Sequence, residues 1–526
     1  MRKSTSILLP MVVSFLLWAS GTSLAEPLEL WLYYPTNFQP KESISKLEPI
    51  WRRAAKAGYT KVLLTDSKFA KLGDLGGMEK QYFGNVEKAK KLAGELKLEL
   101  VPAMFDIGYS NNLLWHDPNL AEGLPVKDSL FVVKNGEARL VADPPVSFSQ
   151  KPAFVDEVVK ISDGVATLED FKENGRINYK LKVSPFRCYH VSAWIKTQEF
   201  SGDPHISVLA GKQSLQHQNL GVKRTQDWTE HHVVFNSLEN SEVNVYLGVW
   251  GGGKGKLQWK NWEIEEVGLL NVLRRPGTPC VVKGYVEGKD YEPIVDPLMG
   301  SKPWKGEFTS WHEPPVIKTK LADGTQLRVS WYHPAIIYDG QVSVCPSEPA
   351  TMGLLADQAK RVKEAFGAKA YMMSHDEIRT WNWDEACMKR NMDAGEILAD
   401  NVRQCAKLLE GSRVYVWSDM FDPFHNAHGD YYLVRGDFKG SWQGLDPSVT
   451  IMNWNFGKRD ESLKFFADRG HKQVIAGYYD APVGQVKKWL EAAKKVKGVE
   501  GVMYTTWKGN YRDVEEFGRI VREGSN

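Results

Sequence analysis

The sequence lacks a long apolar segment beyond its first 25 residues, and it carries little net charge. No later segment approaches the ~20 apolar residues that a membrane-spanning helix requires, so we expect no membrane span. The formal net charge is +2 and no long Lys/Arg run occurs, which argues against binding to nucleic acid. The sequence has no CxxC pair and no G-x-S-x-G segment. These two absences disfavour a zinc site and a serine esterase.

Residues 1–25 have the pattern of a secretory signal peptide. Arg2 and Lys3 precede the apolar stretch Ile7–Leu17, and residues 23–25 are Ser-Leu-Ala, which suits cleavage after Ala25. We therefore predict a secreted or periplasmic protein. The five cysteines cannot all pair within one chain, so we expect buried thiols with at most one disulfide. We predict no cofactor and no metal, because no histidine has a partner at metal-ligand spacing.

Aromatic residues, by contrast, are abundant, with 19 Trp and 20 Tyr. Sugars present apolar C–H faces beside hydroxyl groups, and flat aromatic rings with nearby polar groups suit such ligands. The composition therefore favours a carbohydrate partner, an oligosaccharide or a polysaccharide, provided that the aromatic residues gather at one site.

Residues 26–147 are expected to begin a (β/α)₈ barrel. Short apolar runs at 28–34, 60–65 and 98–105 alternate with amphipathic helix patterns at 46–57 and 86–96. Strands that alternate with helices in this way are typical of a parallel sheet.

The pattern then changes to alternating apolar and polar residues without helices. Residues 148–267 are predicted to form an inserted antiparallel β-sandwich, because short strands such as 189–195 and 243–249 are separated by turn residues. Residues 268–350 are predicted to be an irregular, β-rich excursion over the barrel mouth, with one strand at 327–332.

Residues 351–526 return to alternating strands and helices. We predict strands at 368–374, 413–417, 449–454, 473–478 and 501–506. Three strands before the insertion and five after it make eight, the number that closes the barrel. The predicted fold class is therefore α/β, a TIM barrel with an inserted antiparallel β-sandwich domain.

The carboxyl ends of the barrel strands are where such folds place an active site. Acids, aromatics and amides follow the predicted strands, as a glycoside pocket requires. The candidate residues are Asp106, His375, Asp376, Glu377, Arg379, Trp417, Asp419, Trp454, Tyr478, Tyr479, Asp480 and Trp507.

The dipeptide Asp376-Glu377 is the strongest of these signals. Cleavage of a glycosidic bond needs an acid to protonate the leaving oxygen and a second group to meet the developing positive charge. Two neighbouring carboxyl groups can divide these tasks, because their repulsion keeps a proton on one of them. Neighbours on a strand face opposite ways, so the chain must bend there if both are to enter one pocket.

Residues 368–511 resemble the hexosaminidases of glycoside hydrolase family 20. The resemblance rests on residues 371–377 (YMMSHDE), on residues 416–419 (VWSD), on a Tyr after the seventh strand and on Trp507 after the eighth. It implies that Glu377 is the general acid and that Asp376 orients the 2-acetamido group of the substrate, whose carbonyl oxygen is the nucleophile. It also implies that Tyr478 or Tyr479 hydrogen-bonds this group and that tryptophans wall the pocket.

The insertion resembles the jelly-roll carbohydrate-binding modules of secreted glycosidases. The resemblance rests on residues 189–196 (YHVSAWIK), on residues 227–230 (DWTE) and on residues 259–262 (WKNW). It implies a β-sandwich fold. Binding of sugar does not follow from the fold alone.

The predicted function is therefore a secreted, retaining, exo-acting glycoside hydrolase of hexosaminidase type. One alternative is a glycosidase for a non-acetamido sugar in which Asp419 or Asp480 is a covalent nucleophile. Another is a non-catalytic glycan-binding protein on the same barrel, and a polysaccharide lyase or esterase is a weaker third.

Overall fold

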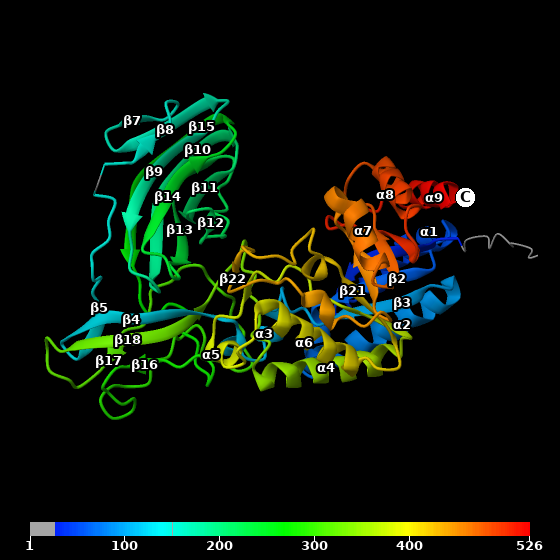
Figure 1. Ribbon diagram of the computed structural model, residues 1–526, viewed down its shortest axis with the longest axis horizontal. Coiled ribbons are helices and arrows are strands. Elements are labelled where there is room, and N and C mark those ends of the chain that lie inside the picture. Colours follow the sequence, from blue (N-terminus) through cyan, green and yellow to red (C-terminus); the bar gives the residue numbers. More distant parts are fainter. Residues whose placement is uncertain (1–26, 150, 526) are drawn as a thin grey trace, which may run out of the picture.

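A computed structural model describes residues 27–149 and 151–525, and it contains a closed barrel of eight parallel strands (Figure 1). In sheet order the strands are β1 (Glu29–Thr36), β2 (Lys61–Asp66), β3 (Glu99–Met104), β19 (Ala370–Met373), β21 (Arg413–Trp417), β23 (Thr450–Asn453), β24 (Gln473–Ala476) and β25 (Val499–Tyr504). The predicted (β/α)₈ barrel, with three strands before the insertion and five after it, is confirmed. The predicted signal peptide lies outside the described residues.

Alternation along β1 shows how the sequence builds the barrel. Trp31 and Tyr33 point into the barrel core, whereas Leu30, Leu32 and Tyr34 pack against the surrounding helices. Successive side chains of a strand face opposite ways, so an apolar run without polar positions fits a strand that is covered on both sides.

Helices cover the outside of the barrel (Figure 1). They are α1 (Ser43–Lys56), α2 (Glu79–Leu96), α4 (Pro349–Phe366), α6 (Ala394–Leu408), α7 (Arg459–Ala467), α8 (Val486–Ala493) and α9 (Val514–Ser525), with the short α3 (Asn111–Leu114) and α5 (Glu385–Met388) in loops. In α1 the buried residues Leu47, Trp51 and Ala54 recur at helical spacing and form the face that packs inward. The strand β21 is followed by the 3₁₀ turns η4 (Asp419–Phe421) and η5 (Ser441–Gly444) rather than by a longer helix.

The excursion between β3 and β19 contains a β-sandwich of two five-stranded sheets. One sheet has the order β13-β10-β15-β8-β7, with β13 (Gln226–Asn236), β10 (Cys188–Ser201), β15 (Gly253–Glu266), β8 (Val165–Phe171) and β7 (Lys160–Ser162). The other has the order β12-β11-β14-β9-β6, with β12 (Gln213–Ser214), β11 (Pro204–Ala210), β14 (Glu242–Val249), β9 (Gly175–Lys182) and β6 (Phe154–Val155). The predicted inserted sandwich is therefore present.

A third five-stranded sheet joins the sandwich to the barrel. Its order is β16-β18-β4-β5-β17, with β16 (Val281–Val282), β18 (Gln326–Pro334), β4 (Gly123–Lys134), β5 (Glu137–Leu140) and β17 (Ile317–Lys318). Residues 123–140, which we had placed with the first part of the barrel, thus belong to this sheet. They pair with a strand about 200 residues later, a partner that local periodicity does not reveal.

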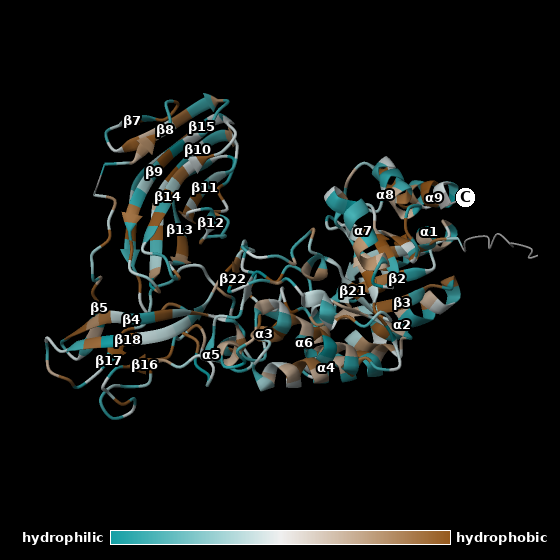
Figure 2. Ribbon diagram, in the orientation of Figure 1, coloured by the Kyte–Doolittle hydropathy of each residue, from teal (hydrophilic) through white to brown (hydrophobic). Residues whose placement is uncertain are grey.

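The sandwich and the barrel loops share one apolar cluster. Side chains of the sandwich core pack with Ile337 of the excursion, Trp383 after β19 and Leu433 in β22 (Leu433–Val434). The hydropathy colouring in Figure 2 shows brown segments where the sandwich approaches the third sheet and the barrel loops. Because the two parts share this cluster, the sandwich packs against the barrel loops and is not connected to them by a linker alone.

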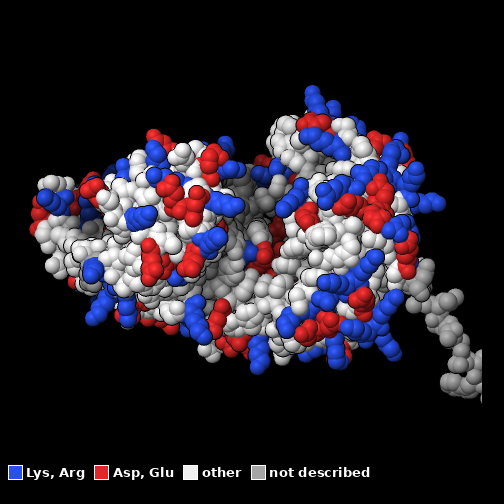
Figure 3. All heavy atoms as spheres, turned by 90° about the horizontal axis from the view of Figure 1, so that it is seen from above, with Lys and Arg blue, Asp and Glu red and all other residues white. Residues whose placement is uncertain are grey.

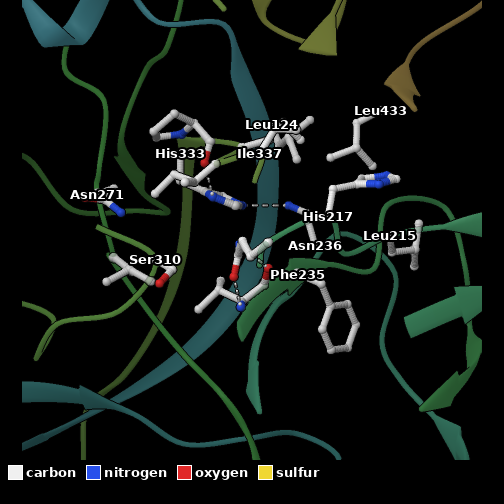
Figure 4. Close-up of a pocket in the computed structure, with 16 residues that line it drawn as sticks. Leu124, Leu215, His217, Phe235, Asn236, Asn271, Ser310, His333, Ile337 and Leu433 are labelled. Atoms are coloured by element: carbon white, nitrogen blue, oxygen red, sulfur yellow. Dashed lines mark hydrogen bonds between the residues drawn. The ribbon is translucent and has the colours of Figure 1, made fainter. Parts of the chain in front are cut away.

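A small cavity lies at this junction, between β13 and β18 (Figure 4). Its volume is about 20 Å³, the space of roughly one water molecule. The Asn236 side-chain amide donates to His333 Nε2 at 3.1 Å and to the carbonyl of Pro125 at 3.0 Å. Polar groups in this cavity therefore bond to one another.

Within residues 27–149 and 151–525, no helix combines the length and the apolar character needed to cross a membrane.

Candidate active site

The carboxyl ends of the eight parallel strands surround a pocket of about 480 Å³. Figure 3 shows a hollow between the sandwich and the barrel with acidic side chains at its floor. The pocket is lined by Tyr33, Leu63, Thr65, Ala103, Asp106, Tyr109, Ser374, Asp376, Glu377, Trp417, Trp454, Tyr479 and Trp507. A volume in the range of about 300–1,000 Å³, with carboxyl groups among aromatic rings, is typical of a small-molecule site.

A local turn places both Asp376 and Glu377 in this pocket. The strand β19 ends at Met373, and Glu377 has a φ of 49°, in the left-handed region. A non-glycine residue in that conformation is strained, and such strain is common at functional sites. Gly108 lies against this turn, and a Cβ atom there would collide with the carbonyl oxygen of Asp376. Neighbouring residues on a regular strand would face opposite ways, but this bend lets the side chains of both Asp376 and Glu377 enter the pocket.

The Asp376 carboxyl is surrounded by other acids. Burial raises its pKa well above the usual value, and the nearby carboxyls of Asp419, Glu377 and Asp106 raise it further. Burial also raises the pKa of Asp106 to about 6, although a hydrogen bond from Ser374 opposes this rise. Burial and the neighbouring like charges therefore both favour the protonated form of Asp376.

Glu377 is held by two donors at the edge of the pocket. Its Oε1 pairs with the Arg379 guanidinium at 2.7 Å, and its Oε2 accepts a hydrogen bond from the Tyr109 hydroxyl. Its side chain remains 25% exposed, so the carboxyl is fixed in direction and still open to a ligand. Pre-oriented groups of this kind lower the cost of reaching a reactive geometry.

Arg379 acts behind Glu377 rather than in the pocket. Its guanidinium donates to the Gln341 side-chain oxygen and lies over the rings of Tyr109, Tyr338 and Tyr432 at 5.6, 4.8 and 5.1 Å. The side chain is 5% exposed and does not line the pocket. Arg379 therefore holds Glu377 from behind the pocket, and its predicted contact with substrate stays a prediction.

Five aromatic side chains form the walls, and they contact one another in pairs. The rings of Trp454 and Tyr479 are stacked, 5.6 Å apart and 10° from parallel. Trp507 lies 6.2 Å from Trp417 and meets Tyr33 edge-on at 4.9 Å. Because these rings pack against one another, they form a continuous apolar surface that suits the C–H faces of a sugar ring.

Asp419 is buried behind the pocket. Its Oδ2 accepts from the Glu377 backbone N–H and from the Asn426 amide, both at 2.9 Å, and its Oδ1 accepts from Trp454 Nε1 at 3.2 Å. Burial raises its pKa to about 7, against the effect of these donors. Asp419 therefore contacts Glu377 and Trp454 from behind the pocket and is not among its lining residues. Its predicted role in substrate binding stays a prediction.

Three further predicted residues point away from the pocket. His375 is fully buried, and its Nε2 lies 3.0 Å from the Asn401 oxygen in α6. The Tyr478 hydroxyl donates to Asp513 at 2.8 Å, outside the barrel. Asp480 accepts from the Thr506 hydroxyl at 2.6 Å and from the Trp507 backbone at 2.7 Å. The structure bonds each of these side chains to a neighbouring element, and their predicted contacts with substrate stay predictions.

The remaining predicted residues do meet in the pocket, and Tyr479 is the tyrosine of its pair that faces inward. Sequence reasoning missed Tyr109 and Gln341, which support Glu377 and Arg379. Tyr109 stands three positions after Asp106, on a loop that leaves a barrel strand, and this position is a usable signal. Gln341 lies in the irregular excursion, where nothing in the local sequence marks it.

One buried cluster has metal-ligand chemistry, but it lies outside this pocket. The ligand atoms of Glu122, Cys345, Asp384 and Cys387 lie within 4.8 Å of one another. Asp384 already accepts from Arg275 at 2.6 Å and from the Cys387 backbone at 3.0 Å, and the two sulfur atoms are 3.7 Å apart. These contacts join the excursion to the loop after β19. All five cysteines are free thiols in this structure.

Comparisons with known proteins give similarity of fold. No protein-family model and no curated protein matches the chain. A solved glycoside hydrolase family 20 β-N-acetylglucosaminidase aligns with a TM-score of 0.37 and 10% identity, over 95% of this chain and 69% of that one. A rhamnosidase from Novosphingobium sp. PP1Y aligns with a TM-score of 0.37 and 11% identity, over 95% of this chain and 59% of that one.

A CBM4 structure aligns with 22% of this chain and 77% of its own length, at a TM-score of 0.18 and 14% identity. All three TM-scores lie below 0.5, so the proposed function rests on the residues that line the pocket.

Proposed function

We propose that this protein is a retaining, exo-acting glycoside hydrolase of hexosaminidase type. The observation that carries the proposal is one pocket at the carboxyl ends of the barrel strands, in which Asp376 and Glu377 face a wall of aromatic rings. The N-terminal sequence supports an exported enzyme, and we propose an oligosaccharide or polysaccharide as its substrate.

In this proposal Glu377 is the general acid. Its carboxyl lies beside Tyr109 at the edge of the pocket, and its side chain is 25% exposed. A leaving oxygen at the edge would meet Glu377, whereas the sugar ring would lie deeper against Trp417 and Trp454. Transfer of a proton from a positioned acid is worth about 10²–10⁴ in rate.

Asp376 and Tyr479 are proposed to hold a 2-acetamido group of the substrate. Asp376 is enclosed on the floor of the pocket, and Tyr479 reaches the same cavity from the loop after β24. The acetamido oxygen would then attack the anomeric carbon, and Asp376 would stabilise the positive charge on the ring that forms. A preorganised site of this kind binds the charge-bearing state more tightly than the ground state.

The contacts of the other acids support substrate assistance over a protein nucleophile. The oxygen atoms of Asp419 and Asp480 accept hydrogen bonds from neighbouring protein groups, and neither residue lines the pocket. Asp106 does line it, so a covalent mechanism through Asp106 is the second candidate. A non-catalytic glycan-binding protein remains the alternative from another class.

The test is hydrolysis of methyl 2-acetamido-2-deoxy-β-glycosides, whose leaving group must be protonated, by the wild type, by Glu377→Gln and by Glu461→Gln as a surface control. We expect activity in the wild type and in the control, and a large loss in Glu377→Gln. Binding of the sugar by all three proteins without turnover in any of them would favour the non-catalytic alternative instead.

A further inference from the structure

A second depression lies next to the pocket, on the other side of Tyr109. It has a volume of about 390 Å³ and is lined by Tyr109, Asn111, Asn112, Tyr338, Asp339, Gly340 and Gln341. Tyr109 lines both cavities, and its hydroxyl donates to Glu377 Oε2. The carboxyl of the proposed acid therefore lies at the boundary between the two cavities.

The depression is preformed because two distant segments are tied together by hydrogen bonds. The Asn111 side chain donates to the carbonyl of Gly340 at 2.7 Å and accepts from the Val342 backbone at 3.1 Å. The Gln341 amide donates to the carbonyls of Gly108 and Glu377, at 3.0 and 3.2 Å. The loop after β3 and the end of the excursion thus form one rigid rim beside Glu377.

The sandwich also supports this rim. The Tyr338 N–H donates to the carbonyl of His217 at 2.8 Å, and the Asn219 amide donates to Asp339 Oδ1 at 3.0 Å. The Tyr338 hydroxyl contacts the hydroxyl of Tyr432, whose backbone carbonyl accepts from the Gln213 amide. The inserted sandwich therefore fixes the side chains that line the depression.

The chemistry of the lining suits a sugar residue. Tyr109 and Tyr338 are 42% and 38% exposed and offer ring surface to a ligand. The Asn112 side chain makes no hydrogen bond to another described residue, and Asp339 keeps its Oδ2 open on this side. Ring surface next to a free amide and a carboxylate oxygen matches the C–H face and the hydroxyl groups of a sugar.

We propose that this depression binds the sugar residue on the leaving-group side of the bond that is cleaved. The inference rests on the proposed function, because it takes Glu377 as the acid that protonates the leaving oxygen. A bond held at Glu377 has one sugar in the main pocket, and the group attached to the leaving oxygen extends past Tyr109 into the depression. The enzyme then prefers a glycan over a glycoside with a small leaving group, and the sandwich contributes to specificity through Tyr338 and Asp339.

The test compares two probes, N,N′-diacetylchitobiose and 2-acetamido-2-deoxy-β-glucosyl fluoride. The fluoride leaving group is too small to reach the depression. Asn112→Ala should lower kcat/KM for the disaccharide about tenfold more than for the fluoride, because a hydrogen bond to the second sugar is lost. Asn174→Ala, in the loop between β8 and β9 of the sandwich, lines neither cavity and should change neither value.

Each outcome separates the two proposals. An equal change for both probes in Asn112→Ala would overturn the subsite and leave the proposed function intact. Asn112→Ala is decisive because its side chain makes no hydrogen bond within the described residues, so its removal leaves the contacts of Glu377 and Arg379 in place. A wild type that hydrolyses neither probe would contradict the proposed function and the subsite with it.

Discussion

The pocket at the barrel mouth and the cavity at the sandwich junction both collect polar side chains, but they differ in what those side chains bond to. At the junction, Asn236 and His333 bond to each other around about 20 Å³ of space. At the mouth, Asp376, Glu377 and Asp106 face about 480 Å³ of open volume. Polar groups that satisfy one another stabilise a fold, whereas polar groups held toward open space are available to a ligand.

Among changes at the barrel mouth, Asp376→Asn should have the largest effect on catalysis, because it removes a carboxyl group that faces the open pocket. If Asp376 stabilises the charge of the cyclised intermediate, kcat should fall by about 10³, as for loss of a preorganised group in other active sites. Steady-state hydrolysis of an aryl 2-acetamido-glycoside measures this loss. Asp357→Asn, on the exposed face of α4, is the matched control.

The same variant also separates the mechanisms. Under substrate assistance, a 2-fluoro sugar should label no carboxyl group in the wild type or in Asp376→Asn, and a thiazoline mimic should bind the wild type more tightly than substrate does. Mass spectrometry that found the label on Asp106 would contradict substrate assistance and favour the covalent alternative.

Tyr478 and Tyr479 allow the same comparison within one loop, because only Tyr479 lines the pocket. Tyr479→Phe removes a hydroxyl from the pocket and should lower kcat by about 10², with little change in stability. Tyr478→Phe removes the hydrogen bond to Asp513 and should cost about 1 kcal/mol of unfolding free energy with little change in kcat. Kinetics and urea denaturation of both variants measure this. The reverse pattern would mean that the wrong tyrosine has been assigned to the pocket.

A substitution in the junction cavity should lower the stability of the protein and leave its activity nearly unchanged. Asn236→Ala removes three side-chain hydrogen bonds and leaves the His333 ring nitrogen without its donor, which should cost about 2–3 kcal/mol of unfolding free energy. Activity of the folded variant should stay within about twofold, since the main pocket makes no use of Asn236. Denaturant unfolding measures the first effect, and a tenfold loss of kcat would show that the junction takes part in catalysis.

The smallest effect concerns pH. Burial lowers the pKa of His333 to about 4, below its usual value near 6.5, so the folded state binds fewer protons than the unfolded state between these values. Stability that His333 contributes is therefore present above about pH 6.5 and is lost as the pH falls toward 4. Between pH 6.5 and 5 the wild type should lose about 1–2 kcal/mol that His333→Gln does not lose. Identical pH profiles would remove His333 from this role.

The sequence predicted the barrel because its signals are local. Apolar runs mark the barrel strands, amphipathic helices follow most of them, and the position of Asp376 and Glu377 follows from the end of one such strand. The third sheet could not be predicted, because β4 and β18 pair across about 200 residues. The roles of His375 and Tyr478 were missed for a related reason. Each stands one position before a residue that lines the pocket, and only the observed bends of the chain decide which of two neighbours faces inward.

The most direct test of the central claim is the dependence of Glu377→Gln on the leaving group. A general acid matters for an alkoxide that must be protonated and matters little for a leaving group that departs unaided. We predict that Glu377→Gln lowers kcat/KM by about 10²–10⁴ for a methyl 2-acetamido-glycoside and by less than about tenfold for the 2,4-dinitrophenyl glycoside. An equal loss for both substrates, or no loss for the methyl glycoside, would contradict the assignment of Glu377 as the general acid.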